Sequence, residues 1–355
     1  MRIRFLTSTP LDIRRGSGTY VGIHVLADAL RGLGHWVEIE GSRAHLPVYT
    51  AERLLFNRRL KPSRDFDLSV GFDVDGYRIA PDDPSHVASL KGVIADEVRF
   101  ERGITRATMS VQARCERLHA QRAARVIAPS RYSAERAAEV YGLRKTPAVV
   151  PELIDLPQWR ALLERNAARS QRFTVLFVGR LYRRKRVDTL LRAASRLRGT
   201  IPGIEFRMVG DGPCAGPLRR LSSDLGLEGA VEWLGDVSRS ALAAEYNRAD
   251  LFCLPSVQEA FGIVMLEAMA AGKAIVASRA ASIPEVAPHA QLVEPDDAEA
   301  LAAGIEALYR SPEQRAAMAA AGPSRVEQFD APRVARLFLE ACAGTLGSPA
   351  PDQRK

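Results

Sequence analysis

Short apolar runs alternate with longer amphipathic stretches along the chain. Residues 173–178, Phe-Thr-Val-Leu-Phe-Val, have the length and composition of a buried strand. In residues 19–33, apolar positions recur at the spacing of one helical face, and Gly34 follows as a stop signal. The alternation predicts repeated β-α units and parallel sheets. The predicted strands are 3–7, 37–39, 68–70, 92–95, 125–129, 173–178, 204–209, 231–234, 251–254 and 274–277, and the main predicted helices are 19–33, 105–124, 132–140, 262–271 and 332–343.

This pattern occurs twice, which predicts two successive α/β domains. Residues 157–171 have few strand formers and are interpreted as the region between the domains. A chain of 355 residues is long enough for two domains. We expect an N-terminal domain at 1–160 joined by a C-terminal helix at 331–344, a second domain at 161–330, and a frayed tail at 345–355.

The composition is that of an ordinary globular protein, with 46% hydrophobic and 26% charged residues, which excludes a disordered or fibrous chain. The net charge of +8 favours anionic partners: nucleic acid, acidic lipid headgroups or phosphorylated small molecules. An aromatic content of 6% weakens any function based on stacking single-stranded bases.

The expected location is cytoplasmic, at most peripheral to the inner face of a membrane. Four cysteines lie far apart without a Cys-x-x-Cys pair, which fits a reducing compartment. The first residues contain no apolar stretch typical of a signal peptide, and no window approaches the ~18 apolar residues of a membrane span.

The strongest chemical signal is the segment 255–267, which follows a predicted strand and enters an Ala-rich helix. The first N–H groups of a helix are unpaired and favour a phosphate. Glu267 lies among apolar neighbours inside this helix and needs hydrogen-bond donors, which vicinal sugar hydroxyls would supply. Glu259 precedes the helix in its loop. The alternative is that Glu259 is a solvated loop acid and that Glu267 faces solvent.

A second signal is basic. The segment Gly179-Arg180-Leu-Tyr-Arg-Arg-Lys185-Arg follows the first strand of the second domain, so Arg180 can bind a phosphate bidentately and Lys185 can act as a point charge. The alternative is a solvated basic loop. A weaker signal is Gly16-Ser17-Gly18, where two glycines before a helix allow close backbone approach to an anion.

Other patterns carry less weight. Gly210-Asp-Gly212 nominally fits a dinucleotide fingerprint, but Pro213 interrupts it, so NAD is not expected. Asp73-Val-Asp75 resembles the metal-binding Asp-x-Asp of a known glycosyltransferase fold, and it is interpreted as a turn. The six histidines show no metal-ligand spacing, and no metal is expected.

In order and spacing, these motifs resemble the retaining GT-B glycosyltransferases of family four (glycosyl transferases group 1) over nearly all of residues 1–330. Glu259 and Glu267 match that family's paired glutamates, and Gly179-Arg180 with Lys185 matches its basic segment. Further segments fall in the family's order: Val209-Gly-Asp-Gly-Pro213, Leu234-Gly235, Ala249-Asp250, Leu254-Pro-Ser256 and Ile283-Pro-Glu285.

The resemblance implies an α/β fold of GT-B type, with two Rossmann-like domains facing a central cleft. It implies a metal-independent hexosyl transfer from a nucleotide-diphosphate sugar, a co-substrate rather than a cofactor, to a hydroxyl of a glycan, lipid-linked intermediate or metabolite, with retained anomeric configuration. Glu259, Arg180 and Lys185 would be catalytic. The donor would contact Gly16, Ser17, Gly18, Gly179, Arg180, Lys185, Gly210, Val237, Glu259, Ala260, Phe261, Gly262, Ile263, Val264 and Glu267.

Three departures from the family pattern stand out. Many relatives have a histidine after the strand that here is predicted at 92–95, and this chain has Asp96, taken as the acceptor-side catalytic candidate. The interdomain Pro-Asn-Gly segment reads Pro-Glu-Leu-Ile-Asp at 151–155, and a Gly-Gly pair is replaced by Ala281-Ser282.

Two other functions are consistent with parts of the sequence. A catalytically silent GT-B scaffold could bind a partner or an anionic membrane, although the intact Arg180, Lys185, Glu259 and Glu267 argue against decay. Nucleic-acid binding is suggested by net charge alone, and a diphosphate explains the same cationic residues, so no nucleic-acid partner is expected. The nucleotide base, the sugar and the acceptor stay open.

Overall fold

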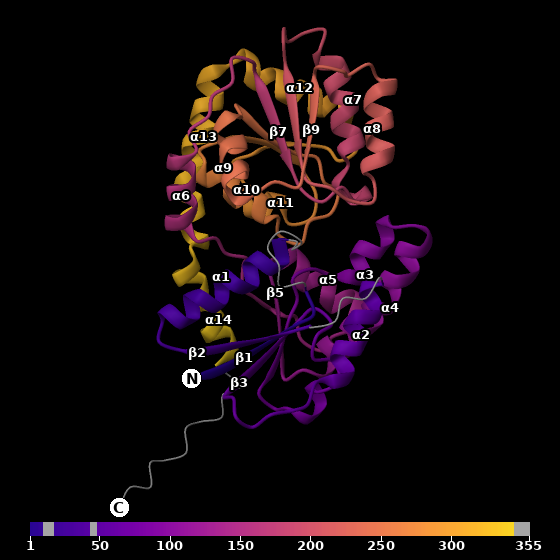
Figure 1. The fold of residues 1–355 in the computed structure, drawn as a ribbon, viewed down its shortest axis with the longest axis vertical. Coiled ribbons are helices and arrows are strands. Elements are labelled where there is room, and N and C mark those ends of the chain that lie inside the picture. The colour runs from indigo at the N-terminus through magenta and orange to yellow at the C-terminus, as the bar shows by residue number, and fades with distance from the viewer. Residues whose placement is uncertain (10–17, 43–47, 344–355) are drawn as a thin grey trace, which may run out of the picture. The chain divides into compact units, whose positions relative to one another are not determined.

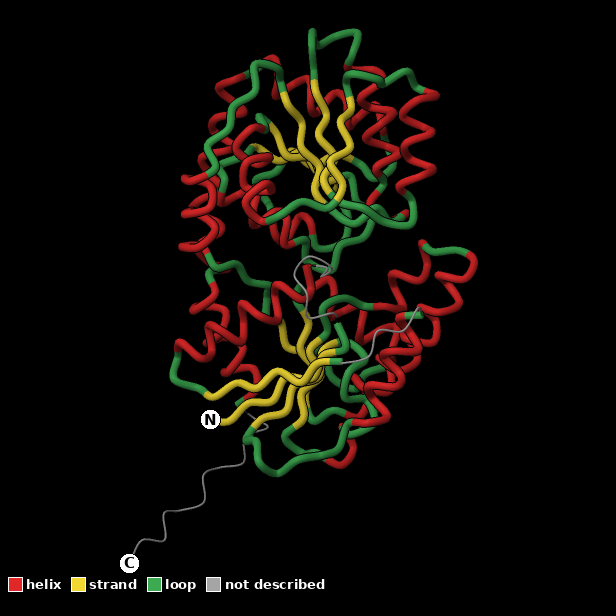
Figure 2. The backbone as a smooth tube through the Cα atoms, in the orientation of Figure 1, coloured by secondary structure: helices red, strands yellow, loops and turns green. Residues whose placement is uncertain are grey.

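The computed structural model describes residues 1–9, 18–42 and 48–343, and the chain folds into two compact units (Figure 1). The first unit comprises Met1–Pro151 together with the C-terminal residues from Pro332, and the second comprises Glu152–Ala331. Helices flank the strands of each sheet (Figure 2). The predicted α/β class and its repeated β-α units are confirmed.

The first unit contains a six-stranded parallel sheet in the order β2-β1-β3-β4-β5-β6. Its strands are β1 (Arg2–Thr7), β2 (Trp36–Gly41), β3 (Leu68–Phe72), β4 (His86–Ser89), β5 (Arg125–Ala128) and β6 (Ala148–Val149). Its helices are α1 (Gly18–Gly32), α2 (Tyr49–Arg59), α3 (Ile94–Glu97), α4 (Gly103–Arg122), α5 (Arg131–Tyr141) and α14 (Ala331–Cys342), with 3-10 turns at Ala80–Asp82 and Val98–Phe100.

The last helix belongs to the first unit because its apolar face packs there. The Phe338 ring lies 6.2 Å from that of Phe5 on β1, and Arg125 Nη1 donates to the carbonyl of Ala341 over 2.9 Å. The Phe5 ring in turn meets Phe72 edge to face at 5.1 Å. Each fully buried side chain of this size contributes roughly 1.5–3 kcal/mol.

The second unit repeats the architecture, with the strand order β12-β11-β10-β7-β8-β9. Its strands are β7 (Thr174–Val178), β8 (Glu205–Val209), β9 (Val231–Gly235), β10 (Leu251–Leu254), β11 (Ala274–Ser278) and β12 (Gln291–Val293). Its helices are α6 (Leu156–Arg165), α7 (Val187–Leu197), α8 (Ala215–Asp224), α9 (Arg239–Arg248), α10 (Ile263–Ala270), α11 (Ile283–Val286), α12 (Ala298–Arg310) and α13 (Pro312–Val326), with 3-10 turns at Arg183–Lys185 and Glu327–Phe329.

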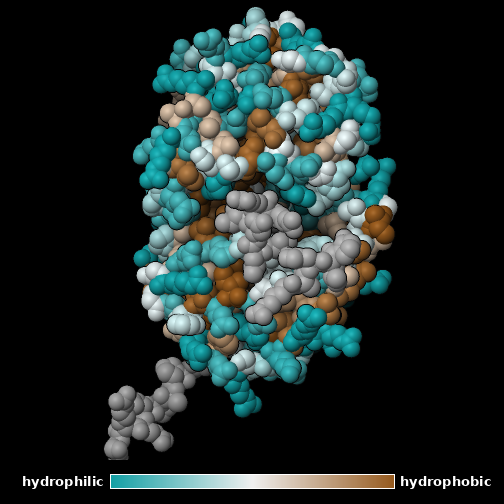
Figure 3. Space-filling model, viewed as in Figure 1, coloured by the Kyte–Doolittle hydropathy of each residue, from teal (hydrophilic) through white to brown (hydrophobic). Residues whose placement is uncertain are grey.

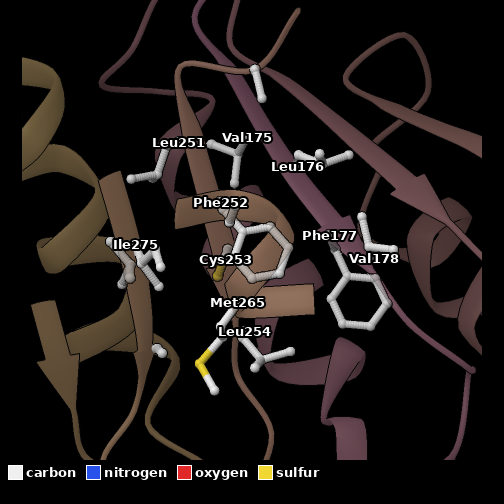
Figure 4. Close-up of a cluster of buried hydrophobic side chains, with 14 of the residues drawn as sticks. Val175, Leu176, Phe177, Val178, Leu251, Phe252, Cys253, Leu254, Met265 and Ile275 are labelled. Atoms are coloured by element: carbon white, nitrogen blue, oxygen red, sulfur yellow. The ribbon is translucent and has the colours of Figure 1, made fainter. Parts of the chain in front are cut away.

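The core of the second unit lies under the central strands. Leu251 and Phe252 of β10 pair in register with Val175 and Leu176 of β7, and all four are fully buried. Met265 of α10 lies next to Leu254 in the same cluster (Figure 4). The helix in which the 255–267 segment ends, α10, is therefore anchored to the sheet. Hydrophilic side chains cover most of this unit's face in Figure 3.

Two sequence predictions are wrong. Residues 92–95 do not form a strand, because Ile94–Glu97 is a short helix. The strand at this place in the sheet is β4, and its sequence His-Val-Ala-Ser begins and ends on polar residues, so it lacks the apolar run that predicts a buried strand. Residues 157–171 are not simply a linker, because α6 occupies Leu156–Arg165. Asp155 caps this helix, and its side chain accepts from the Gln158 amide at 2.9 Å.

Candidate functional site

The sequence motifs of the second unit gather at the carboxyl ends of β10, β7 and β8, which are neighbours in the sheet. Backbone hydrogen bonds join the loops that follow these strands. The Val257 amide donates to the Arg184 carbonyl over 2.9 Å, and the Leu181 amide donates to the Asp211 carbonyl over 3.0 Å. Ligands of open parallel sheets bind at such an edge.

Lys185 and Glu259 form an ion pair at the centre of this edge. Lys185 Nζ lies 2.6 Å from Glu259 Oε1, and the same oxygen accepts from Ser256 Oγ at 2.8 Å. Their side chains are 14% and 7% exposed. Glu259 is therefore not the solvated loop acid of the alternative interpretation, and the basic segment is not simply a solvated loop.

Two glycines set the loop geometry. Gly210 has φ +114°, and a Cβ there would lie 2.2 Å from the carbonyl oxygen of Gly179, so the two loops touch through their backbones. Gly262 has φ +86° and precedes the first turn of α10. Because the first N–H groups of a helix lack intrahelical partners, the segment 261–264 offers amide donors beside Glu259.

The serine and alanine that replace the family's Gly-Gly pair also bear on Glu259. Ser282 Oγ donates to the Glu259 carbonyl over 3.0 Å, which holds the loop from the other side. Ala281 adopts φ +50°, a conformation that glycine occupies at lower cost. The departure from the family pattern therefore adds a hydrogen bond to this loop and introduces backbone strain.

Glu267 is buried inside α10, as predicted, but its partners are protein groups. Arg239 pairs with its Oε1, and Tyr246 donates to its Oε2 over 3.1 Å. Burial, and then the charge of Glu267, raises the pKa of Tyr246 well above its ordinary value.

Trp159 of α6 completes this cluster. Its ring lies 4.4 Å from the Arg239 guanidinium, and its Nε1 donates to the Glu267 carbonyl over 3.2 Å. Sequence reasoning missed Arg239, Tyr246 and Trp159. The available signal was Ser238, a residue type that caps helices, which indicated that a helix begins here.

The remaining predicted residues of this unit differ in exposure. Arg180 is exposed at the edge, with its guanidinium 5.9 Å from the Tyr182 ring. Phe261 is buried, whereas Val237 and the residues at 260 and 262–264 are half-buried. Within the described residues, no group of three or more His, Cys, Asp or Glu side chains could hold a metal ion.

The predicted residues of the first unit have a different setting. Gly16 and Ser17 lie outside the described residues, and Gly18 begins α1. Asp96 is fully buried: its Oδ1 accepts from Arg99 at 2.7 Å and from Arg136 at 3.1 Å, and its Oδ2 accepts from Tyr132 at 2.7 Å. Both carboxylate oxygens are therefore bound to groups of the fold.

Comparisons with solved structures define the class of fold. Sucrose-phosphate synthase from Thermosynechococcus elongatus superimposes with a TM-score of 0.79 at 20% identity, covering 97% of this chain and 100% of that one. WaaG, a glycosyltransferase of lipopolysaccharide biosynthesis, gives 0.73 at 18% identity, covering 98% and 100%. The fold is that of the GT-B glycosyltransferases, which confirms the expected class.

The sequence comparisons agree with the resemblance. Residues 160–325 match the family described as Glycosyl transferases group 1, which confirms the resemblance. The D-inositol 3-phosphate glycosyltransferase of Pseudarthrobacter chlorophenolicus is 32% identical over 232 residues, 62% of this chain and 55% of that protein. The GDP-mannose-dependent alpha-(1-6)-phosphatidylinositol monomannoside mannosyltransferase of Mycolicibacterium smegmatis is 31% identical over 209 residues, 54% and 55%. The chain thus spans about half the length of these relatives.

Among the described helices, none combines the length and the apolar character needed to cross a membrane.

Proposed function

We propose that this protein is a glycosyltransferase that moves a sugar from a nucleotide-diphosphate sugar to a hydroxyl group of an acceptor. The observation that carries the proposal is the ion pair of Lys185 and Glu259 beside the amides that open α10, on an edge where Arg180 is exposed. Cations and unpaired amides in one place suit a diphosphate, and the adjoining carboxylates suit sugar hydroxyls.

The proposed assignment follows the chemistry of each group. Arg180, Lys185 and the amides at 261–264 bind the diphosphate and stabilise the charge that develops on it as the glycosidic bond breaks. Glu259 contacts the transferred sugar. Glu267, oriented by Arg239 and Tyr246, accepts hydrogen bonds from the ribose hydroxyls. These donors replace a metal ion, so we propose metal-independent transfer.

Retention of the anomeric configuration is part of the proposal. It rests on the family resemblance and on the setting of Glu259, whose carboxylate is held by Lys185 and Ser256. We propose attack on the face that the diphosphate leaves, with the leaving phosphate taking the proton of the acceptor hydroxyl. The acceptor oxygen gains the sugar, and the nucleotide diphosphate departs with that proton.

The test is turnover of UDP-, GDP-, ADP- and dTDP-sugars by the full chain, measured as nucleotide diphosphate release. Removing one preorganised donor costs ~2.7–4 kcal/mol, so Arg180→Ala should lose roughly a hundredfold or more in rate. Arg183→Ala changes an exposed arginine of the same loop and is the matched control, expected to keep its rate. Absence of turnover with every donor, or equal loss in both variants, would contradict the proposal.

A further inference from the structure

Arg239 lies at the ligand-binding edge of the second sheet. It is the first residue of α9, the helix that follows the carboxyl end of β9 at Gly235. Ser238 caps this helix by accepting from the Ala241 amide at 3.2 Å, so the first turn of α9 is fixed beside that strand end. Because ligands of open parallel sheets bind at this edge, Arg239 is placed to meet one.

The carboxylate of Glu267 can accept more hydrogen bonds than the protein supplies. Arg239 Nη1 donates to its Oε1, and the Tyr246 hydroxyl lies 3.1 Å from its Oε2. The same hydroxyl lies 3.0 Å from the Val264 carbonyl, so two acceptors share its one proton. Burial, followed by the charge of Glu267, raises the pKa of Tyr246 well above its ordinary value, so the hydroxyl keeps that proton. Since a carboxylate has about four acceptor positions, Glu267 retains capacity for donors of a ligand.

The guanidinium of Arg239 has spare donors in the same way. A guanidinium carries five N–H groups. Apart from the Nη1 bond to Glu267, no hydrogen bond joins this one to any residue that the structure describes. The Arg239 side chain is 31% exposed, whereas that of Glu267 is 7% exposed. The guanidinium is therefore the more accessible half of the pair, and a ligand that reaches Glu267 meets its N–H groups.

Trp159 of α6 holds the guanidinium in place. The centre of its buried ring lies 4.4 Å from Arg239 Cζ, within the range of a cation–π contact. The ring meets that of Tyr246 edge to face at 5.7 Å, and Nε1 donates to the Glu267 carbonyl over 3.2 Å. One side chain thus contacts the three other members of the cluster. Because Arg239 is fixed before a ligand arrives, little side-chain entropy is lost when the ligand binds.

Arg239 and Glu267 present a donor and an acceptor side by side. A hydroxyl group is both, so it can donate to the carboxylate while it accepts from the guanidinium. The neighbouring 2′ and 3′ hydroxyls of a ribose fit this arrangement. A phosphate oxygen fits it less well, because it has no proton to donate and would lie beside the carboxylate.

We propose that Arg239 contacts the donor nucleotide directly, donating to a hydroxyl of the ribose 2′,3′-diol that in turn donates to Glu267, and that this contact selects ribonucleotide donors over deoxyribonucleotide donors. The inference rests on the proposed function, in which Glu267 accepts from the ribose. It adds a binding residue from α9 and names the class of donor. Trp159 is a positioning residue that acts through Arg239.

The experiment is calorimetric titration of the full chain with UDP, GDP and ADP and with their 2′-deoxy and 3′-deoxy forms. For the nucleotide that binds, we expect at least one deoxy form to bind wild type about tenfold more weakly than the parent. Arg239→Met keeps an unbranched side chain but removes every N–H group. It should weaken binding of the parent by about tenfold and change the Kd of that deoxy form by less than about threefold.

The same substitution in a Glu267→Gln background separates direct contact from orientation of Glu267. It also avoids leaving a buried carboxylate without its cation, so the chain is expected to fold, as checked by circular dichroism. The side-chain amide in this background needs no cation, so an Arg239 that acted only through Glu267 would have no further effect. A direct contact predicts that Arg239→Met again weakens binding of the parent and not of the deoxy form.

Arg248→Met is the matched control. Arg248 is the last residue of the same helix, its side chain is 35% exposed, and it lies 3.8 Å from the carboxylate of Glu245. Because it lies at the opposite end of α9 from Arg239, its substitution should leave every Kd unchanged.

Four results would overturn the inference alone, since nucleotide binding persists in each. They are equal binding of the parent and both deoxy forms by wild type, equal weakening of parent and deoxy forms in Arg239→Met, tighter binding in that variant, and no effect of Arg239→Met in the Glu267→Gln background. If no nucleotide binds wild type and no sugar donor is turned over, the proposed function fails and the inference fails with it.

Discussion

Replacing Lys185 by methionine should destabilise the second unit, because it leaves the buried carboxylate of Glu259 without its cation. Glu259 would keep the Ser256 hydroxyl but lose the ammonium 2.6 Å away. Removing one partner of a buried ion pair costs about 3–5 kcal/mol, and both side chains here are less than one-sixth exposed, at 14% and 7%. At about 2–4 °C per kcal/mol for a domain of this size, the melting temperature should fall by about 6–20 °C.

A double variant identifies the cause. Lys185→Met/Glu259→Gln removes both charges and should recover much of the stability that Lys185→Met loses. Thermal and urea unfolding of the wild type, both single variants and the double variant form the assay.

Two outcomes would refute this reasoning. A loss below about 1 kcal/mol in Lys185→Met would match an exposed pair and not a buried one. A loss that is unchanged in the double variant would show that Lys185 stabilises the loop by packing and not by charge.

Two further changes test other parts of the structure. Gly210→Ala places a Cβ 2.2 Å from the Gly179 carbonyl oxygen at φ +114°, so unfolding experiments should show a loss of more than about 2 kcal/mol, whereas Gly216→Ala inside α8 should stabilise by about 0.5–1 kcal/mol. Burial raises the pKa of Glu116 well above its ordinary value in the fold, so its contribution to stability is present at low pH and is lost as pH rises above its ordinary pKa. The melting temperature of Glu116→Gln relative to wild type should therefore rise from pH 5 to pH 8, and a difference independent of pH would contradict this.

The hydrophobic pattern was sufficient to predict most of the sheets, because a buried parallel strand needs a short apolar run with few polar positions. Residues 173–178 and 251–254 are examples. It failed at β4, where His86 and Ser89 are polar yet buried, and where the His86 side chain is paired with His119 on α4. Such a partner lies far along the sequence, and periodicity does not detect it.

The same limit applies to the candidate site. The resemblance assigned Lys185 and Glu259 to one donor site, and both segments follow predicted strands. That these strands, β7 and β10, are neighbours in the sheet is known only from the structure. The partners of Glu267 could not be found in this way: Arg239 and Tyr246 come from α9, and their contacts depend on how helices pack. Trp159 was missed because a short polar helix resembles a linker in composition.

The central claim is that the edge formed by Arg180, Lys185, Glu259 and the start of α10 binds a nucleotide diphosphate without a metal ion. Its most direct test is calorimetric titration of UDP, GDP, ADP and dTDP into the full chain, in EDTA and again in excess Mg²⁺. We expect one nucleotide to bind with the same Kd in both conditions, and Arg180→Ala to weaken that Kd by about tenfold to a hundredfold, the value of a hydrogen bond to a charged group. Binding that requires Mg²⁺, or that Arg180→Ala leaves unchanged, would contradict the claim.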